Sequence, residues 1–303
     1  MTWVSPATTA RLQAARTTAH RVASSQEAWI ERFGDDALLS YKHEAARDTA
    51  LAELPGWEAR CGIVFRRVFG KFIARHSDER TAPSLLAGDA ALPLTAVVQE
   101  NGLSFSVDFG AGYSAGLFID QRANRAFLRH AAPKRLLNTF AYTCAFSVAA
   151  AVAGAETWSV DLSKKSLTRG RENFALNSLR DSAHRFIAED VHEFLPRLAR
   201  RGELFDAIVL DPPTFSRGHR GRRFQVESDL EPLLIAALEI AAPNALVLVS
   251  TNCARLSDPD LERTARYALK LTRRSGDLHR EPSLPDIPPE FAPRTLWLRL
   301  RGS

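Results

Sequence analysis

From about residue 116 onward, short apolar runs alternate with segments of helical periodicity. Apolar runs without polar alternation are typical of strands buried on both faces, and such strands separated by helices predict a mostly parallel sheet covered on both sides. The fold class we expect is α/β, a doubly wound Rossmann-like sheet. The expected strands are 135–139, 157–161, 185–188, 205–210, 245–250 and 294–301, and the expected helices are 145–153, 164–177, 191–200, 230–241 and 260–273.

The first part of the chain shows a different pattern. Apolar residues recur at helical spacing from residue 1 to about 50, which predicts helix there. Residues 62–75 alternate between polar and apolar positions, as a strand does. Residues 80–93 contain two prolines and a glycine and are expected to form a loop.

A β-hairpin is expected near residue 101. The apolar runs 95–100 and 103–109 are separated by Asn101-Gly102, a dipeptide that favours the tight turn of a hairpin. We therefore expect two domains. A small α+β domain covers 1–115, and the sheet domain covers 116–303.

Composition and charge narrow the class of protein. Hydrophobic content of 45% and charged content of 25% are ordinary for a soluble globular chain, and we expect neither a membrane-spanning helix nor a signal peptide. Cys61, Cys144 and Cys253 lie far apart, so we expect no disulfide framework, no metal site and a reducing, cytoplasmic location. The net charge of +5 permits nucleic-acid binding, although abundant arginine can equally reflect coding bias.

Acidic residues follow three of the predicted strands. In an open parallel sheet, ligands bind at the carboxyl ends of the strands. Asp161 suits the hydroxyls of a ribose, Asp190 suits an adenine amino group, and with Asp211 they form a cleft able to hold a nucleoside that carries a cationic sulfonium. The alternative for Asp161 and Asp190 is helix capping, because Asp often precedes a helix.

The segment Asp211-Pro212-Pro213-Thr214-Phe215 is the most specific of these strand ends. The two prolines fix φ and remove backbone donors, so the chain is rigid and its carbonyls remain available as acceptors. Such acceptors, together with the aromatic ring of Phe215, can hold a flat base. A simple proline-rich turn is the alternative. It fits less well here, because an acidic residue ends a buried strand.

Several ordered motifs carry a family resemblance over residues 95–256. They are GLFIDQRANR (116–125), LLNTFAYTCAFSVAAAVAGAETWSVDLS (136–163), RENFALNSL (171–179) and VLDPPTFSRG (209–218), with a weaker match in RFGDDALLSYKHEAARD (32–48). The chain resembles the class I methyltransferases that modify 23S rRNA. It is most similar to the guanine-N7 half of the bifunctional large-subunit enzyme, whose relatives make 5-methylcytosine.

The resemblance implies S-adenosylmethionine as cofactor and assigns residues to it. Asn138, Phe140, Tyr142 and Thr143 would line the methionine part, Asp161 and Leu162 the ribose and adenine, Asp190 and Val191 the adenine edge, Gln121 and Arg122 would close over the cofactor, and Asp211, Pro212, Pro213 and Phe215 would face the substrate base. The alternatives are a core role for Phe140 and a surface role for Arg122. Contact with RNA would fall to residues 1–115 and to the basic loop Arg217–Arg223.

One position departs from the family pattern and one decides the reaction. The family carries glycine where this chain has Cys144, and a side chain there can narrow the cofactor pocket. Carbon-5 of cytosine needs activation by a thiolate, whereas guanine N7 has a free lone pair. Thr251 occupies the place of the thiolate in the cytosine-modifying relatives, and Cys253 lies two residues later.

The sequence therefore favours methylation of guanine N7 in 23S rRNA, with four alternatives. These are a cytosine-C5 methyltransferase, a small-molecule or protein methyltransferase on the same core, a non-catalytic RNA-binding module and a nicotinamide dehydrogenase. The dehydrogenase fits poorly because no GxGxxG follows the first strand of the sheet. The sequence does not predict the oligomeric state.

Overall fold

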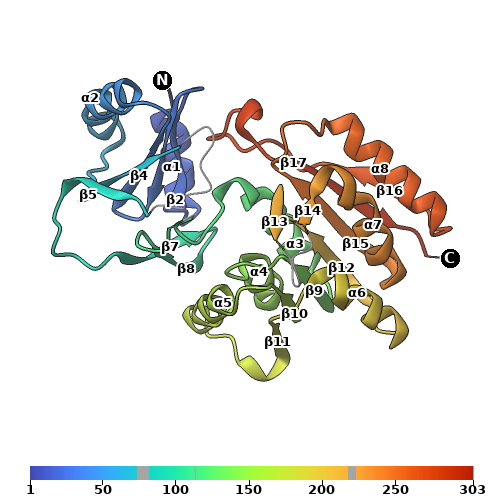
Figure 1. Cartoon of the computed structure of the whole chain (residues 1–303). Helices are drawn as coiled ribbons and strands as arrows, with labels where there is room; N and C mark the ends of the chain where they lie inside the picture. Colours follow the sequence, from blue (N-terminus) through green and yellow to red (C-terminus); the bar gives the residue numbers. More distant parts are fainter. Residues whose placement is uncertain (74–81, 113, 218–222, 303) are drawn as a thin grey trace. The chain divides into compact units, whose positions relative to one another are not determined.

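The computed structural model describes residues 1–73, 82–112, 114–217 and 223–302 and divides into two compact units (Figure 1). Unit 1 contains residues 1–122 and 283–291, and unit 2 contains 123–282 and 292–303. The division falls at Arg122, beyond the expected boundary at residue 115. It also returns a segment near the C-terminus to unit 1, which no local pattern in the sequence indicates.

Unit 2 is built on a seven-stranded sheet with the strand order β11-β10-β9-β12-β15-β17-β16. The strands are β9 (Arg135–Thr139), β10 (Glu156–Val160), β11 (His184–Ile187), β12 (Phe205–Leu210), β15 (Ala241–Thr251), β16 (Gly276–His279) and β17 (Arg294–Leu300). The first five in this order are parallel, and β17 pairs antiparallel with β15 and β16. The chain order of the strands reverses between β9 and β12, the place where open α/β sheets bind their ligands.

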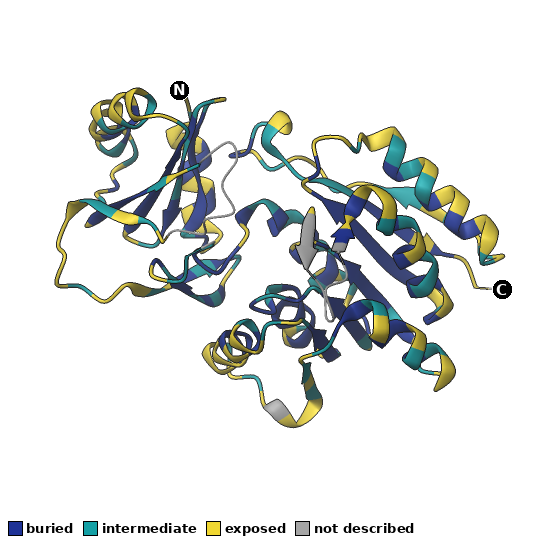
Figure 2. Ribbon diagram, viewed as in Figure 1, coloured by how far each residue is buried: buried dark blue, intermediate teal, exposed yellow. Residues whose placement is uncertain are grey.

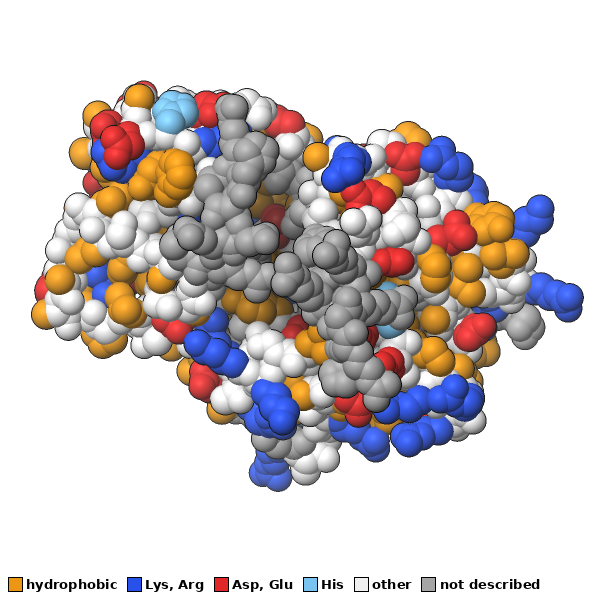
Figure 3. Space-filling model, viewed as in Figure 1, with side chains coloured by type: hydrophobic (Ala, Val, Ile, Leu, Met, Phe, Trp, Pro, Cys, Tyr) orange, Lys and Arg blue, Asp and Glu red, His pale blue; other side chains and the backbone are white. Residues whose placement is uncertain are grey.

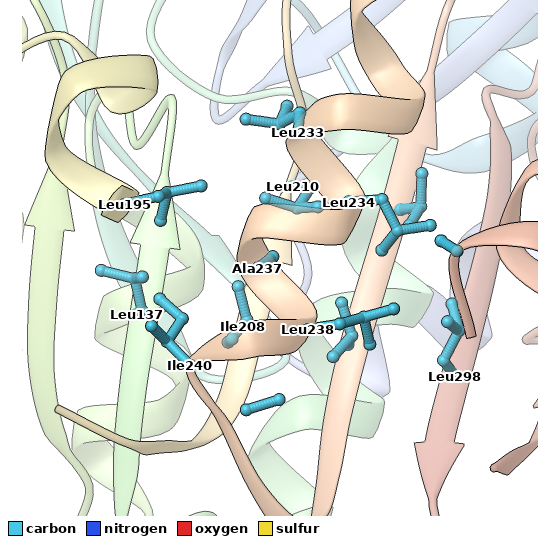
Figure 4. Close-up of a cluster of buried hydrophobic side chains, with 14 of the residues drawn as sticks. Leu137, Leu195, Ile208, Leu210, Leu233, Leu234, Ala237, Leu238, Ile240 and Leu298 are labelled. Carbon is cyan, nitrogen blue, oxygen red and sulfur yellow. The ribbon is translucent and has the colours of Figure 1, made fainter. Parts of the chain in front are cut away.

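Helices cover both faces of this sheet, so the predicted doubly wound fold is confirmed. They are α3 (Arg122–Ala131), α4 (Ala145–Val152), α5 (Lys164–Leu176), α6 (Val191–Arg200), α7 (Val226–Glu239) and α8 (Asp258–Leu271). Helices α6, α7 and α8 pack on one face and α3 and α4 on the other. Figure 4 shows Leu234 and Leu238 of α7 among the side chains of Ile208 and Leu210 of β12. The strands are buried, and the outer faces of the helices are exposed (Figure 2).

The remaining elements of unit 2 are short. They are the hairpin β13 (Phe215–Arg217) with β14 (Arg223–Gln225) and the 3₁₀ turn η2 (Asp181–Ala183). Within the described ranges, no helix is long and apolar enough to cross a bilayer.

Unit 1 is built on a six-stranded sheet in which the strands follow chain order. The elements are β1 (Thr2–Trp3), α1 (Pro6–Ala14), β2 (Ala19–Ser24), β3 (Ala28–Phe33), β4 (Asp36–Tyr41), α2 (Glu44–Cys61), β5 (Arg67–Phe72), β6 (Ser84–Gly88), the hairpin β7 (Thr95–Glu100) with β8 (Leu103–Asp108), and the 3₁₀ turns η1 (Ile119–Gln121) and η4 (Pro289–Phe291). Only β4 and β5 are parallel, and α2 connects them. Leu54 and Trp57 of α2 pack on Ile30 and Leu39 of the sheet and form its core.

The helix expected over residues 1 to 50 is wrong, because only Pro6–Ala14 is helical before three strands follow. Strands β2 and β4 are buried at every position, so they lack the polar alternation that marks a half-buried strand. The loop expected over 80–93 is also partly wrong, since it contains β6. The hairpin at Asn101-Gly102 is confirmed, and both residues have the positive φ, 49° and 78°, that its tight turn requires.

A buried ion pair holds the segment 283–291 in unit 1. The guanidinium of Arg122 contacts the carboxylate of Asp286, and the side chains of both residues are buried. Asp286 also accepts a hydrogen bond of 2.9 Å from the backbone N–H of Arg21 in β2. Because a charge left alone in the interior is costly, each partner holds the other in place.

Replacing Asp286 tests this pair. Asp286→Asn leaves the Arg122 guanidinium buried without its counter-charge, so the free energy of unfolding in urea should fall by about 3–5 kcal/mol. Asp277→Asn is the matched control, because its pair with Arg301 is exposed and its loss should change little. Equal effects of the two substitutions would contradict the role of the buried pair.

His20 of β2 makes the stability of unit 1 depend on pH. Its ring is buried, with Nδ1 2.8 Å from the carbonyl oxygen of Arg21. Burial, helped by the positive charges of Arg32 and Arg122, lowers the pKa of His20 from 6.5 to about 4. The unfolded chain therefore binds a proton at a higher pH than the folded chain, and the stability present above pH 6.5 is lost as the pH falls toward 4.

His20→Gln should remove this contribution. The wild-type chain should lose roughly 3 kcal/mol more unfolding free energy than the variant between pH 7 and pH 4. Urea titrations of both chains across that range measure the difference. Parallel curves for the two chains would show that folding leaves the pKa of His20 unchanged.

Candidate functional site

Four strands of unit 2 end side by side. In the register of the parallel pairs, Thr139 of β9 lies opposite Val160 of β10 and Leu210 of β12, and Val160 lies opposite Ile187 of β11. The residues that follow these four strands therefore gather at the carboxyl ends of the strands. They include Phe140, Asp161, Asp190 and Asp211.

The loop from Phe140 to Cys144 follows β9 in an uncommon conformation. Phe140, Tyr142 and Cys144 all have left-handed backbones, with φ values of 51°, 48° and 62°. This conformation costs an L-residue roughly 1–2 kcal/mol. Residues held in it cluster at binding sites, where the surrounding structure determines them.

Hydrogen bonds from neighbouring elements hold this loop. The N–H of Ala141 donates to the carbonyl of Val160 at 3.0 Å, and the N–H of Tyr142 donates to Asp161 Oδ2 at 2.9 Å. Asn173 of α5 donates its side-chain N–H to the carbonyl of Thr143 at 2.9 Å. Strand β10 and helix α5 therefore fix the path of the backbone after β9.

The carboxylates that follow β10 and β11, those of Asp161 and Asp190, have different local roles. Asp161 accepts N–H groups from Tyr142 and Ser163, and its burial raises its pKa against the effect of these two bonds. Asp190 is the N-cap of α6 and accepts the N–H of His192 at 2.9 Å. Capping therefore describes Asp190 well, whereas Ser163, not Asp161, caps α5.

The other residues expected around the cofactor differ in exposure. Asn138 is buried and donates to Ser147, while Thr143 and Val191 are also buried. Leu162 is 46% exposed beside Asp161, which leaves a flat apolar surface there. Their contacts with the cofactor stay predictions.

Three further residues expected near the cofactor have contacts within their own units. The ring of Phe140 lies 6.0 Å from that of Phe224 and 6.4 Å from that of His192. Gln121 and Arg122 belong to unit 1 and are buried, so Arg122 does not have the surface role considered as an alternative. Its guanidinium is engaged by Asp286, and closure over the cofactor stays a prediction for both.

The Asp-Pro-Pro segment directly follows β12. Asp211 is half-buried, Pro212 is buried and Pro213 is exposed. The backbone of Phe215 opens β13, but its side chain lies outside the described part, as do residues 218–222 of the basic loop.

The side chain of Cys144 lies in the interior, on the side of the loop that faces α5. It is fully buried, its Sγ is 3.7 Å from the carbonyl oxygen of Tyr142, and burial raises its pKa to about 12. Its neighbour is Gly170 of α5, where an added Cβ would overlap Cys144 Sγ and lie 3.1 Å from Cys144 Cβ. The missing side chain at Gly170 thus makes the space for the thiol.

Gly170 and Asn173 were not predicted as site residues, although both support the loop. The signal for Gly170 is a glycine inside a predicted helix, where it costs about 1 kcal/mol relative to alanine. Asn173 gives no such signal, because a polar residue on a helix is ordinary. Its burial to 0% exposure appears only once α5 is packed.

The arrangement fits a nucleoside that carries a positive charge. It offers a rigid backbone turn, carboxylates at three strand ends and the apolar surface of Leu162. In the described ranges, no group of three or more histidine, cysteine or acidic side chains is arranged to bind a metal ion.

Comparison with known proteins identifies the family. Residues 45–299 match the family described as S-adenosylmethionine-dependent methyltransferase. The chain belongs to this family. S-adenosylmethionine is the cofactor after which this family is named, and the doubly wound sheet of unit 2 is the fold of its members' catalytic domain.

Three relatives illustrate the match. The methyltransferase is 37% identical over 193 residues to YwbD of Bacillus subtilis, named as a ribosomal RNA large subunit methyltransferase, covering 63% of this chain and 48% of the relative. It is 31% identical over 266 residues to ribosomal RNA large subunit methyltransferase I of Tolumonas auensis, covering 86% and 66%. SMU.776, described as a methyltransferase and solved in complex with SAH, superposes with a TM-score of 0.82 at 28% identity, covering 97% and 78%. The chain spans between about half and two thirds of the two sequence relatives.

The pairing of Cys144 with Gly170 predicts opposite effects of one substitution in two backgrounds. Gly170→Ala in the wild-type methyltransferase should lower the free energy of unfolding by about 1–3 kcal/mol, because the new methyl overlaps the thiol. In a Cys144→Gly background the same change should be neutral or stabilising by up to about 1 kcal/mol, since alanine favours helix. Urea unfolding of the four chains measures the coupling. A cost that is the same in both backgrounds would contradict the pairing.

Proposed function

We propose that this methyltransferase transfers a methyl group from S-adenosylmethionine to a base of large-subunit ribosomal RNA, at guanine N7. The observation that carries the proposal is the placement of Asp211-Pro212-Pro213 directly after β12. The loop 140–144 follows the neighbouring parallel strand β9 at the same end of the sheet. The segment proposed to accept hydrogen bonds from the base and the turn proposed to bind the cofactor thus follow neighbouring strands. The names of the relatives support ribosomal RNA as the substrate.

The chemistry asks little acid–base catalysis of the chain. S-adenosylmethionine, when bound, supplies a methyl group on a positively charged sulfur. Asp161, Leu162 and Asp190 would hold its nucleoside, and Asn138, Phe140, Tyr142 and Thr143 its methionine part. The chain's task is to align a base and exclude water, because an in-line displacement depends on alignment.

Asp211 has a role that fits guanine. Its carboxylate can accept a hydrogen bond from the exocyclic amine, and the carbonyl of Pro212 is a second acceptor. Held by that edge, guanine needs no proton removed from N7, which has a free lone pair. The prolines keep the segment rigid, since their φ angles are fixed.

The cysteine positions argue against cytosine C5 as the target. Thr251 at the end of β15 is buried, and its Oγ1 accepts the N–H of Cys253 at 3.0 Å. Cys253 itself is 3% exposed and packs in the apolar cluster of α6, α7 and α8. A nucleophilic thiolate needs an accessible, electropositive setting, whereas the Cys253 thiol is buried and has the carboxylate of Glu227 as a hydrogen-bond partner.

Nucleoside mass spectrometry tests the proposal. The purified chain is incubated with S-adenosylmethionine and with 23S rRNA from cells that lack this protein, and the product nucleosides are measured. We expect 7-methylguanosine from the wild-type chain and from Cys253→Ser. Asp211→Asn should lower kcat/KM about tenfold to hundredfold, because a hydrogen bond to a charged group contributes about 1.5–3 kcal/mol. Glu239→Gln, an exposed carboxylate on α7, is the matched control.

Each other outcome names a different activity. 5-Methylcytidine that disappears in Cys253→Ser would establish the cytosine reaction. Unmodified rRNA with turnover of the methyl donor on small molecules or proteins would move the enzyme to another substrate class. Binding of rRNA without consumption of S-adenosylmethionine would leave a non-catalytic RNA-binding module.

A further inference from the structure

The arginines near the two outermost strands of the unit 2 sheet, β16 and β11, have different kinds of partner. At the β16 edge, Arg301 pairs with Asp277 at 2.6 Å, and Arg280 pairs with Glu262 at 2.7 Å. At the β11 edge, Arg185 and Arg171 have no carboxylate partner among the described residues. Both of these side chains are exposed.

Aromatic rings hold the two arginines of the β11 edge instead. The guanidinium of Arg185 lies 4.0 Å from the ring centre of Trp158, its partner in the register of β10 and β11. Arg171 of α5 lies 4.5 Å from the ring centre of Phe186, the next residue of β11. Because successive strand residues point to opposite faces, the two guanidinium groups lie on opposite sides of the edge strand.

A stacked guanidinium is prepared for an anion. Stacking covers its flat face and limits its rotation, while the N–H groups stay at its rim. These N–H groups form a planar fork that matches two oxygens of a phosphate. The described part of the chain supplies no acceptor for the forks of Arg171 and Arg185.

The surrounding elements add positive charge. Residues 164–201 contain nine lysines and arginines against five acidic residues. Those that are exposed are Lys164, Lys165, Arg171, Arg180, Arg185, Arg200 and Arg201. Arg197 differs, since it pairs with Glu189. In Figure 3, blue side chains gather at the lower margin, where Figure 1 shows α5, β11 and α6.

We infer that the β11 edge is an RNA-binding surface, with Arg171 and Arg185 as its phosphate contacts. The inference rests on the proposed function, which makes RNA the substrate. The carboxyl end of β11 leads to Asp190, so a strand of RNA bound along this edge lies beside the site of the cofactor. Contacts to phosphate position an RNA without reading its sequence, which suits an edge that presents exposed arginines.

Filter binding to protein-free 23S rRNA over a series of salt concentrations tests the surface. The variant Arg171→Gln/Arg185→Gln should bind about tenfold more weakly, and the slope of log affinity against log salt should fall by about 1.4, since each phosphate contact to a single strand contributes about 0.7. Arg280→Gln/Arg301→Gln at the β16 edge is the matched control and should keep the wild-type affinity and slope. Equal losses in the two pairs would overturn the inference.

A second variant separates charge from geometry. Arg171→Lys/Arg185→Lys should recover the salt slope, because both charges remain, but only part of the affinity, because lysine lacks the planar fork. A lysine pair with the slope of the glutamine pair would contradict phosphate contact. Retained binding of S-adenosylhomocysteine by all variants shows that they are folded.

The proposed function and this surface can fail separately. If the wild-type chain binds rRNA through the β11 edge but makes no methylated base, the surface stands and the reaction is wrong. If methylated guanosine forms while the glutamine pair binds as tightly as the wild type, the reaction stands and these arginines only shield the edge strand from pairing with another strand.

Discussion

The structure of the site depends on the left-handed turn that follows β9. Three of its residues have side chains and positive φ values, a conformation that each L-residue avoids by itself. Hydrogen bonds that Val160 and Asp161 accept and that Asn173 donates offset that cost. The turn is therefore a property of the packed sheet and of α5, and it exists only when β9, β10 and α5 are in place.

This dependence explains how the turn accommodates Cys144, at a position where the family resemblance implies glycine. Cys144 accepts a positive φ, and its thiol lies in space that a second glycine, Gly170, leaves open. The small residue that this packing requires is Gly170, in helix α5.

The sequence predicted unit 2 well because buried parallel strands appear as apolar runs that end in acidic or polar residues. The strands at 135–139 and 205–210 and the helix at 191–200 match the structure residue for residue. Unit 1 was harder for a physical reason. Its strands β2 and β4 are buried throughout yet contain His20, Arg21 and Asp36, so neither alternation nor an apolar run marks them.

The candidate site was predictable only in part. Residues at strand ends follow from the order of the elements, so the positions of Asp161, Asp190 and Asp211 after β10, β11 and β12 were predicted from the sequence. Contacts that join distant segments do not follow from local pattern, and the pair of Arg122 with Asp286 is one example. The stacking of Arg185 on Trp158 is another, because it depends on the register of two strands.

Calorimetric titration of the purified chain and of the variant Asp161→Asn with S-adenosylhomocysteine tests whether the turn after β9 binds the cofactor. Asp161 holds the turn through the N–H of Tyr142 and lies where the ribose is expected. We expect saturable binding at one site per chain, weakened about tenfold or more in the variant, as the loss of a charged hydrogen bond implies. No binding by the wild-type chain, or equal affinity in the variant, would contradict this expectation.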